Sequence, residues 1–571
     1  MMGPMQSSSA EKTPTEGAGI SRTADKGDKS ADISRGEVTF YHWLVVLLAA
    51  LGWLFDCMGQ RIFVLAREPA LKELLGAAAS EADVRRWGGI ATCLLMVGWA
   101  IGGLLFGLIS DKYGRVKSMV ITLLAYTVFS GLSGFARSGL EFLFWRFLFG
   151  VGVGGMFGSA TTLVAESVPP KVRTVALGVM QSLSAGGTML ASLISLKISP
   201  GQENYWGHFT GWQVLSFVGV FPALLVLPIL LILKEPEPWK RAKAAAARGS
   251  GKAVGSVGDL VKEPQWRHNL LVGVCLGVAG MVGLWGIAFF SPELITTAFK
   301  NRPLQAKEIV KPAELVGSLA AATNPATAWI KSKLSSQIVS SLGQNGTAIE
   351  ALVSELNRLI DGENLYNTEA FASVPLLKRT RNLAVRAEHG TPAEIMTLNR
   401  QLLEQTFPGT IRPLQQTIDH TRSIGTTLQD VGAVLGMFAF TFAAGRFSRR
   451  AAFLGSFVLG LGIVAFVFYS LRTETDVYWM LPMMGFATLS PFAGYSIYFP
   501  ELFPTRLRGT GVGFCYNTVR CVTAPFPFLV PWLGAMMGFR AVAMAMCGIY
   551  LVGIVALAWA PETKGKPLPE E

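Results

Sequence analysis

Long apolar runs separated by short polar connections repeat along the 571-residue chain. Each run is long enough to cross about 30 Å of hydrocarbon as a helix. The pattern predicts two sets of six spans, at residues 42–66, 88–110, 117–137, 140–166, 173–196 and 212–233, and then 268–292, 425–444, 451–471, 477–499, 511–536 and 539–560. We therefore expect an all-α protein embedded in a lipid bilayer.

An internal repeat relates the two sets of spans. The segment AESVPPKVRTVALG (165–178) matches PELFPTRLRGTGVG (500–513) at an offset of 335, and the same offset places Arg115 on Arg450. Duplicated halves are a common architecture of secondary transporters. The repeat predicts an N-terminal six-helix bundle at 41–233, a linker at 234–267, and a C-terminal bundle formed by 268–299 and 425–560.

The C-terminal bundle is interrupted by residues 300–424, which are polar but patterned. The segments AWIKSKLSSQIVSSL and AIEALVSELNRLI place apolar residues at helical spacing. The sequence therefore predicts a small helical domain inserted between spans seven and eight. Because each helix must bury its apolar stripe, we expect a compact cap over the mouth of the bundle, tethered through Pro303 and a turn at 421–427.

The charge pattern predicts the orientation of the chain. Lys and Arg exceed Asp and Glu by 50 to 38, and eight of the basic residues lie in the linker 234–267. Basic connections favour the cytoplasmic side, so we expect cytoplasmic tails at 1–40 and 561–571, an extracytoplasmic insertion, and a plasma-membrane location. This distribution argues against nucleic-acid binding. All six cysteines lie inside predicted spans, so we expect neither disulfides nor a metal site, and no cofactor.

The sharpest motif is GLISDKYGRVKS (107–118), between spans two and three. It resembles the loop signature of the major facilitator superfamily, matching it at Gly107, Asp111, Lys112, Gly114 and Arg115. An Asp at such a turn can bind the N-terminus of a helix from the other half, where free N–H groups favour an anion. The motif therefore predicts a latch that forms in one transport state and breaks in the other. The alternative is an ordinary charged turn.

The resemblance extends to the sugar-porter branch and its organic-acid:proton symporter relatives. It is carried by RFLFGVGVGG (146–155), AESVPPKVR, PELFPTRLRG and the terminal PETKGKP. In that group, glutamate–arginine pairs form clusters at the cytoplasmic ends of the helices. The resemblance implies that Glu166 pairs with Arg115 or Arg173, and that Glu501 pairs with Arg508 or Arg450. The alternative is simple surface pairing, which contributes about 0–1 kcal/mol per pair.

Charged residues inside the predicted spans are candidates for function, because they are costly to place there. Asp56 and Gln60 share a face of span one. The surrounding residues resemble the D-G-[FY]-D motif of organic-acid symporters, although Gly59 replaces its second carboxylate. A desolvated Asp56 can still exchange a proton. The alternative is a structural Asp bonded to Gln60 or to a neighbouring helix.

Two arginines lie in other spans. Arg520, with Asn517 on its face of span eleven, is the better candidate to bind a carboxylate in bidentate fashion, although it can instead balance Asp56. Arg146 lies on a glycine-rich face of span four and is either a substrate ligand or a buried structural cation.

Two further residues, Gln181 and Trp285, are available to line the same cavity. Span seven contains no glutamine, so the hexose-binding Gln-Gln pattern of sugar porters is missing. The chain also has no phosphate loop, no HExxH motif and no Ser/His/Asp grouping, so we expect no enzyme. The sequence predicts a monomeric transporter that works by alternating access, as a symporter of protons with a small organic anion. The alternatives are a sugar or polyol transporter, and a sensor or scaffold that binds a partner through the insertion.

Overall fold

The computed structural model describes residues 38–570, apart from 77–78, 202–204, 206, 300–301, 337, 339–348 and 373–391. Within these residues the chain is helical, and the only β-type pairings are two isolated bridges. The cytoplasmic tail predicted at 1–40 lies almost entirely outside the described residues.

The N-terminal half contains six membrane-length elements. They are α2 (Phe40–Leu75), α3 (Glu81–Tyr113), α4 (Arg115–Ser133), α5 (Gly139–Ser167), α6 (Pro170–Lys197), and a sixth made of α7 (Gly211–Val218), a 3-10 turn and α8 (Val226–Ile232). Five of these end close to the predicted boundaries. The exception is α2, which continues nine residues beyond 66 because its polar last turns carry no apolar signal.

The C-terminal half has the same number of elements, although three of them are broken. They are α11 (Pro264–Met281), which leads through a π-helical turn into α12 (Ser291–Phe299), then α20 (Leu414–Arg446), α21 (Arg449–Ser470), α22 (Glu474–Leu502), the three pieces α23 (Arg508–Asn517), α24 (Val519–Thr523) and α25 (Phe526–Met537), and finally α26 (Phe539–Met546) with α27 (Ile549–Ala556). The linker between the halves contains α9 (Glu237–Ala247) and α10 (Val257–Lys262).

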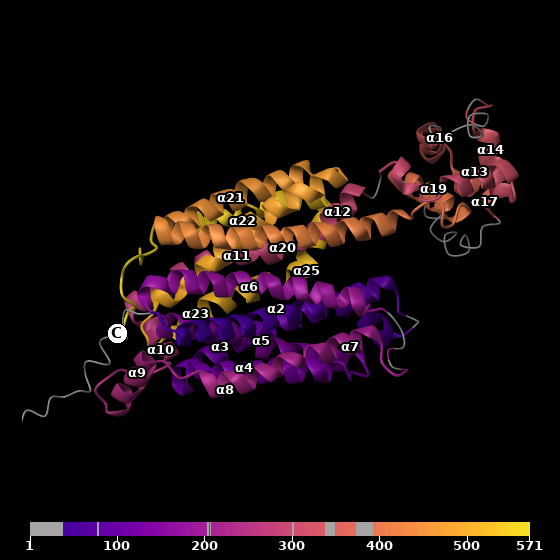
Figure 1. Cartoon of the computed structure of the whole chain (residues 1–571). Helices are drawn as coiled ribbons and strands as arrows, with labels where there is room; N and C mark the ends of the chain where they lie inside the picture. The colour runs from indigo at the N-terminus through magenta and orange to yellow at the C-terminus, as the bar shows by residue number, and fades with distance from the viewer. Residues whose placement is uncertain are drawn as a thin grey trace, which may run out of the picture.

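Ten of these elements, in the described part of the chain, are long and apolar enough to cross a membrane. Helix α22 and the α23–α25 run lie beside them in the same bundle (Figure 1). The protein is therefore a multi-pass membrane protein, and its all-α fold with two six-helix halves confirms the prediction.

The two halves form two layers (Figure 1). The N-terminal helices, drawn in indigo and magenta, form one layer, and α20, α21 and α22 form the other. Contacts between the halves involve α3, α5 and α6 on one side and α20, α22 and α23 on the other. These helices therefore form the interface between the two halves.

Within each half, one helix pair packs through glycine at almost backbone contact. A Cβ on Gly102 of α3 would lie 2.0 Å from the Val151 carbonyl oxygen of α5, and one on Gly432 of α20 would lie 2.0 Å from the Pro482 carbonyl oxygen of α22. Small residues permit such approach between membrane helices. The equivalent position of the two pairs in their halves agrees with the duplication read from the sequence.

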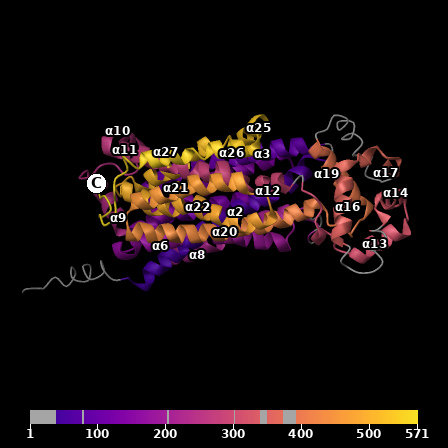
Figure 2. The same ribbon diagram turned by 90° about the horizontal axis from the view of Figure 1, so that it is seen from above.

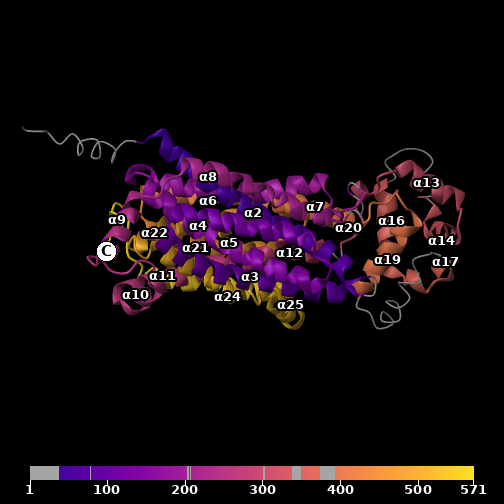
Figure 3. The ribbon, with the colours of Figure 1, turned by 90° about the horizontal axis from the view of Figure 1, so that it is seen from below.

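The insertion between α12 and α20 folds around its own apolar core. Its helices are α13 (Pro312–Ala321), α14 (Pro325–Lys333), α16 (Ile349–Gly362), α17 (Glu369–Ala372) and α19 (Pro392–Thr406). They bury Leu315, Ile330, Leu356, Leu402 and Phe407 together, apart from the core of the bundle. The helical domain expected from periodicity is present. It lies at the end of the bundle away from the C-terminus (Figures 2 and 3). We call this end the insertion end, and the opposite end the latch end.

The predicted limits of the insertion are wrong at its C-terminal side. Helix α20 begins at Leu414, so residues 414–424 belong to the bundle helix and the turn expected at 421–427 is absent. This part of α20, LQQTIDHTRSIG, is polar, and hydropathy cannot distinguish a polar helical extension from a loop. The insertion itself is held by a buried carboxylate, Glu308, which binds Arg302 at 2.7 Å, Arg400 at 2.8 Å and Thr417 of α20 at 3.2 Å.

Candidate functional site

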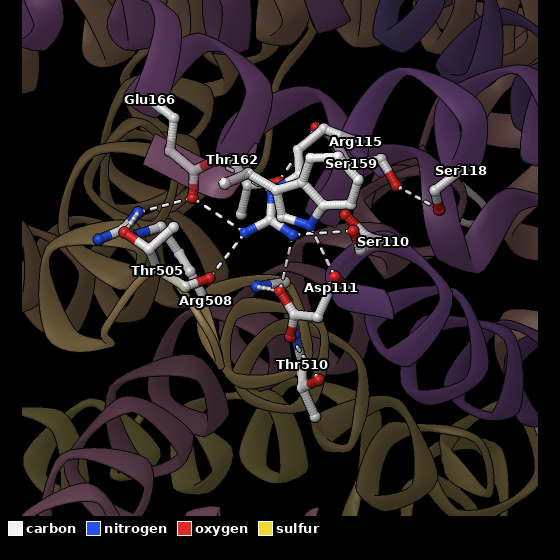
Figure 4. Close-up of polar contacts among 12 residues, drawn as sticks. Ser110, Asp111, Arg115, Ser118, Ser159, Thr162, Glu166, Thr505, Arg508 and Thr510 are labelled. Carbon is white, nitrogen blue, oxygen red and sulfur yellow. Dashed lines mark hydrogen bonds and ion pairs between the residues drawn. The ribbon is translucent and has the colours of Figure 1, made fainter. Parts of the chain in front are cut away.

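The latch end is closed by a contact between the two halves that involves Asp111. At the last turns of α3, its Oδ1 accepts the Gly509 N–H at 2.9 Å, and its Oδ2 accepts the Thr510 N–H at 2.8 Å and the Thr510 hydroxyl at 2.6 Å (Figure 4). These donors form the N-terminus of α23, where the helix dipole favours an anion. The structure thus places Asp111 where the sequence motif expects it.

Close backbone approach makes this contact possible. A Cβ on Gly107 would lie 2.8 Å from the Gly509 carbonyl oxygen, and one on Gly513 would lie 2.4 Å from the Gly103 carbonyl oxygen. Helices α3 and α23 therefore touch along about two turns. Any larger side chain at Gly107 would separate the halves.

A charge-balanced cluster lies beside the Asp111 contact and is fully buried (Figure 4). Arg115 binds Asp111 at 2.9 Å and binds both oxygens of Glu166, at 2.9 and 3.1 Å. Arg508, from the C-terminal half, binds Glu166 at 2.6 Å. A buried ion pair becomes strongly destabilising when one partner is removed. This cluster therefore couples the two halves more strongly than surface pairs would.

The equivalent cluster in the second half is built from a different arginine than expected. Arg449 binds both oxygens of Glu501, at 2.8 and 3.1 Å, and donates to Thr174 of α6. The pairing of Glu501 with Arg450 is wrong, because Arg450 is exposed. The pairing with Arg508 is also wrong, because that side chain reaches Glu166 across the interface. Arg449 and Arg115 both begin their helices, so the repeat offset at this motif is 334.

Two other latch residues take no part in these contacts. Lys112 is exposed, and Arg173 is partly buried but forms no ion pair within 4.0 Å with any described carboxylate. Gly114 has a role of its own, because its φ of 128° and the 2.2 Å approach of Glu235 to a Cβ placed there both disfavour a side chain.

Two capping glutamates at the latch end were missed from the sequence. Glu235 accepts the N–H groups of Arg115, Val116 and Lys117 at the start of α4. Glu562, in the terminal PETKG, likewise accepts those of Arg449 and Arg450 at the start of α21. Burial alone would raise the pKa of Glu562, but these donors and the Lys564 N–H outweigh it and hold that pKa below its usual range. A Glu-Pro or Pro-Glu pair follows each half of the sequence, and this shared pair could have indicated the two capping glutamates.

A cavity of about 1460 Å³ lies between the halves and reaches the insertion end. Its deep part is lined by aromatic side chains, Trp53, Trp99, Trp285, Phe492 and Tyr516. Its mouth is lined by charged ones, among them Arg67, Glu73, Glu293, Asp419 and Arg422. No described residue between 294 and 418 lines it. The described part of the insertion therefore forms none of the cavity wall, and the cap over the mouth stays a prediction.

Arg520 is the cation at the aromatic end of this cavity. Its guanidinium carbon lies 3.5 Å from the centre of the Trp99 ring and 4.7 Å from that of Tyr516. One nitrogen donates to the Tyr516 carbonyl oxygen at 2.8 Å and to the Asn517 amide oxygen at 3.0 Å. The side chain is held flat by these contacts while it lines the cavity. A planar cation between aromatic faces suits a planar anion.

Four of the seven predicted ligands line the cavity: Gln60, Gln181, Trp285 and Arg520. Asp56 does not; it is fully buried, and one of its oxygens accepts from Gln60 at 3.0 Å. Asn517 is also buried, and donates to the Gly154 and Gly513 carbonyl oxygens of α5 and α23. Asn517 therefore joins the two halves and positions Arg520.

Arg146 also lies away from the cavity. It is fully buried, and its guanidinium carbon is within 5.6 Å of the ring centres of Phe63, Phe142 and Phe149. It donates to the Ser216 hydroxyl of α7 at 3.1 Å. These contacts correspond to the structural role weighed for it from the sequence.

The charged residues of the cavity were not identified from the sequence. Those at the mouth lie where helices continue beyond the predicted spans, and those of the wall lie inside apolar runs. Arg67, Glu73, Asp419 and Arg422 lie on the polar extensions of α2 and α20, which the hydropathy pattern assigned to loops. Among the described residues, no three of His, Cys, Asp or Glu group as a metal site would require.

The chain was compared with known proteins. The model of the sugar (and other) transporter family matches residues 51–291 and 414–570, on either side of the insertion. A putative metabolite transport protein of Haemophilus influenzae is 22% identical over 537 residues, which cover 93% of this chain and 99% of that protein.

Other relatives match over shorter stretches. A putative niacin/nicotinamide transporter of Bacillus subtilis is 35% identical over 214 residues, covering 35% of this chain and 49% of the relative. The cis,cis-muconate transport protein of Acinetobacter baylyi is 27% identical over 209 residues, covering 36% and 48%. The chain thus spans about half the length of these two relatives.

Solved structures share the fold. A proton:xylose symporter bound to 6-bromo-6-deoxy-D-glucose superimposes with a TM-score of 0.56 at 17% identity, covering 93% of this chain and 98% of that one. The human organic anion transporter MFSD10 gives a TM-score of 0.52 at 15% identity, covering 90% and 99%. These likenesses show the major facilitator fold, and the family match shows that the chain belongs to the sugar (and other) transporter family.

Proposed function

We propose that the protein is a secondary active transporter that carries a small organic anion together with a proton by alternating access. The observation that supports this most directly is the cavity between the two halves, which reaches the insertion end while the Asp111 latch closes the opposite end. In this state a solute can enter from one side only. Breaking the latch and closing the mouth would expose the same cavity to the other side.

The latch end is proposed to face the cytoplasm of a cell whose plasma membrane holds the protein as a monomer. Eight basic residues lie in the linker 234–267 at that end, as the positive-inside rule requires. Both chain ends then face the cytoplasm, and the insertion lies outside the cell. The cavity of this structure is accordingly open outward.

The preference for an anion rests on Arg520. It is the cation at the aromatic end of the cavity, and both Trp99 and Tyr516 hold its guanidinium flat. A carboxylate can bind it in bidentate fashion while an attached ring or conjugated chain stacks on Trp285. The names of two relatives, which refer to niacin and to cis,cis-muconate, agree with such a substrate.

A sugar is the second candidate, because Gln60 and Gln181 line the same cavity and can hydrogen-bond hydroxyl groups. Purified protein in liposomes distinguishes the two. Uptake of labelled nicotinate, benzoate, cis,cis-muconate and xylose is measured with the outside solution more acidic than the lumen, and a trapped pH dye reports protons.

We expect at least one of the three carboxylates to accumulate above the level in protein-free liposomes and to carry protons inward, with the accumulation abolished by a protonophore. Accumulation of xylose alone would replace the anion with a sugar. If the folded protein moved none of the four compounds, the transport proposal would be rejected in favour of a sensor or scaffold.

A further inference from the structure

The cavity wall carries a pair of opposite charges that no motif identified. Asp430 lies on α20 of the C-terminal half and Arg61 on α2 of the N-terminal half, and both line the cavity. Both sit within helices that cross the membrane. Ionisable residues inside such helices are costly and are retained mainly for function.

Asp430 also makes a hydrogen bond between the halves. The Thr188 hydroxyl of α6 donates to its Oδ2 at 3.1 Å. The carboxylate is therefore anchored on one half and bonded to the other, at a wall that must rearrange when the cavity changes sides. A change in its protonation would therefore alter contacts with both halves.

Among the described residues, the side chain of Arg61 has no hydrogen-bond or ion-pair partner. Its Nε is buried and makes no hydrogen bond to any of them. Asp430 attracts it electrostatically, yet no ion pair within 4.0 Å joins the two among the described residues. The guanidinium is thus near a carboxylate but not saturated by it, which leaves donors free for a carboxylate in the cavity.

The other charged residues on the helices around Asp430 lie well away from it along the chain. Helix α6 has no charged residue between Arg173 and Lys197, and α22 has none between Asp476 and Glu501. Around the same cavity, α12 contributes Glu293, the loop before α7 contributes His208, and α20 itself has Asp419 and Arg422 two or more turns away. Among the described residues, Arg61 is therefore the counter-charge that acts on Asp430.

Asp56, the other acid of the membrane-spanning part of α2, is less well placed to exchange a proton with solvent. It is fully buried, does not line the cavity, and already accepts from Gln60. A proton that arrives from the open mouth meets Asp430 without a conformational change.

We propose that Asp430 binds the co-transported proton and that Arg61 is shared between Asp430 and the carboxylate of the substrate. When Asp430 is ionised, it attracts Arg61 away from the cavity. A proton from the outside solution, bound to a carboxylate oxygen of Asp430, cancels that attraction, and the substrate anion then takes Arg61. After the cavity changes sides, the anion leaves and the proton is released to the other solution. One proton and one carboxylate charge cross together.

This inference rests on the proposed anion symport, and the experiment separates the two. Asp430→Asn is compared with the wild type in liposomes for two activities: uptake driven by a pH gradient, and exchange of labelled for unlabelled anion at equal pH. Nicotinate, benzoate and cis,cis-muconate are all used. We expect Asp430→Asn to keep exchange within about threefold, to lose at least nine-tenths of gradient-driven accumulation, and to show no pH dependence of exchange between pH 5 and 8.

Four variants serve as comparisons. Asp430→Glu keeps a titratable group and should retain coupling. Asp361→Asn removes an exposed acid of α16 in the insertion, away from the cavity lining, and should behave as the wild type. Arg61→Gln should raise the anion concentration needed for half-maximal exchange at least tenfold, and Arg61→Lys should restore part of that loss. Monodisperse elution of each purified variant shows that it is folded.

The outcomes are distinct. If the wild type moves no proton with any of the three anions, the proposed function fails and the inference falls with it. If the wild type is coupled and a folded Asp430→Asn variant remains coupled, the inference alone is overturned. Loss of coupling in Asp56→Asn with retention in Asp430→Asn would assign the proton to Asp56 instead. Loss of both activities in folded Asp430→Asn, with Asp430→Glu also inactive, would make Asp430 a structural residue and reject the proposal.

Discussion

At the scale of single residues, the latch depends on one carboxylate at one helix start. Asp111 accepts three hydrogen bonds from Gly509 and Thr510, and the carboxylate is fully buried. Hydrogen bonds to a charged group contribute about 1.5–3 kcal/mol each. The closed state of the latch end therefore owes several of its strongest contacts between the halves to this residue.

We expect Asp111→Asn to slow transport at least fivefold while the protein remains folded, because the amide keeps the shape but loses the charge and one acceptor. Uptake by liposomes measures the change. The matched control is Lys112→Gln, its exposed neighbour, which should transport normally. Normal uptake by Asp111→Asn would show that the contact at α23 does not control the transport cycle.

Arg520 gives a second test at this scale. Its planar guanidinium is stacked on Trp99, which an ammonium group cannot imitate. We expect Arg520→Lys to reduce anion uptake at least tenfold although the charge is conserved. Arg422→Lys, at the mouth of the same cavity, should change uptake less than twofold. Equal uptake by both variants would remove the basis for the anion preference.

The latch motif could be predicted from the sequence because its spacing fixes which residues meet a helix start. The partner of Glu501 could not. Arg449 and Arg450 are adjacent, and a shift of one residue rotates a side chain by about 100° around a helix. Only the start of α21 shows that Arg449 points inward. Asp430 and Arg61 were missed although the cost of a charge in an apolar span was available as a signal.

At the scale of elements, the clearest prediction concerns Arg449, the arginine that begins α21, and its effect on stability. Arg449 is buried against Glu501, Thr174 and the Ala444 carbonyl oxygen. Arg450 is exposed, and among the described residues only its backbone N–H forms a hydrogen bond. Removing one partner of a buried pair costs about 3–5 kcal/mol, and an exposed substitution costs about 0.5 kcal/mol or less.

We therefore expect Arg449→Ala to lower the melting temperature of the purified protein clearly and to reduce uptake, whereas Arg450→Ala leaves both unchanged. Thermal unfolding in detergent, followed by tryptophan fluorescence, measures the first effect. The double variant Arg449→Ala/Glu501→Ala should be no worse than Arg449→Ala, since the unpaired carboxylate is gone. A larger effect from Arg450→Ala would restore the pairing first expected from the repeat.

The helices themselves were predictable where they are apolar. Ten of the predicted spans agree with helical elements to within seven residues at either end. Both large deviations, at α2 and α20, are polar extensions at the insertion end. Hydropathy identifies the residues that lie in the hydrocarbon and not the ends of the helix. A predicted span therefore ends where the chain leaves the hydrocarbon, even if the helix continues. These two extensions carry much of the charged mouth of the cavity, which is why that part of the site could not be read from the sequence.

At the scale of the whole molecule, the ion pairs and hydrogen bonds of the described residues join the insertion to one half of the bundle and not to the other. Glu308 connects it to Thr417 of α20, and Lys307 and Arg302 bind Glu474 at the start of α22. Both helices belong to the C-terminal half. The insertion should therefore move with that half when the cavity changes sides. Its periodicity predicted its helices, but nothing in the sequence specified where they would rest.

The insertion can be removed at a point where its two ends are already paired. Ile309 and Ile411 form an isolated bridge, and the Val310 N–H binds the Thr410 carbonyl oxygen at 2.8 Å. A short Gly/Ser linker in place of residues 311–409 would preserve this pairing and all of α20. Glu308 would lose Arg400 but keep Arg302 and Thr417.

Because no described residue of the deleted segment lines the cavity, and because the segment has a core of its own, we expect the deleted protein to fold and to transport the anion with a half-saturating concentration and maximal rate within twofold of the wild type. The comparison uses purified protein in liposomes, matched for the amount reconstituted. A folded deletion with strongly reduced uptake would show that the insertion acts on the mouth in another state of the cycle. In that case, the full-length variant Glu474→Gln, which weakens the contact between the insertion and α22, should reproduce part of the loss.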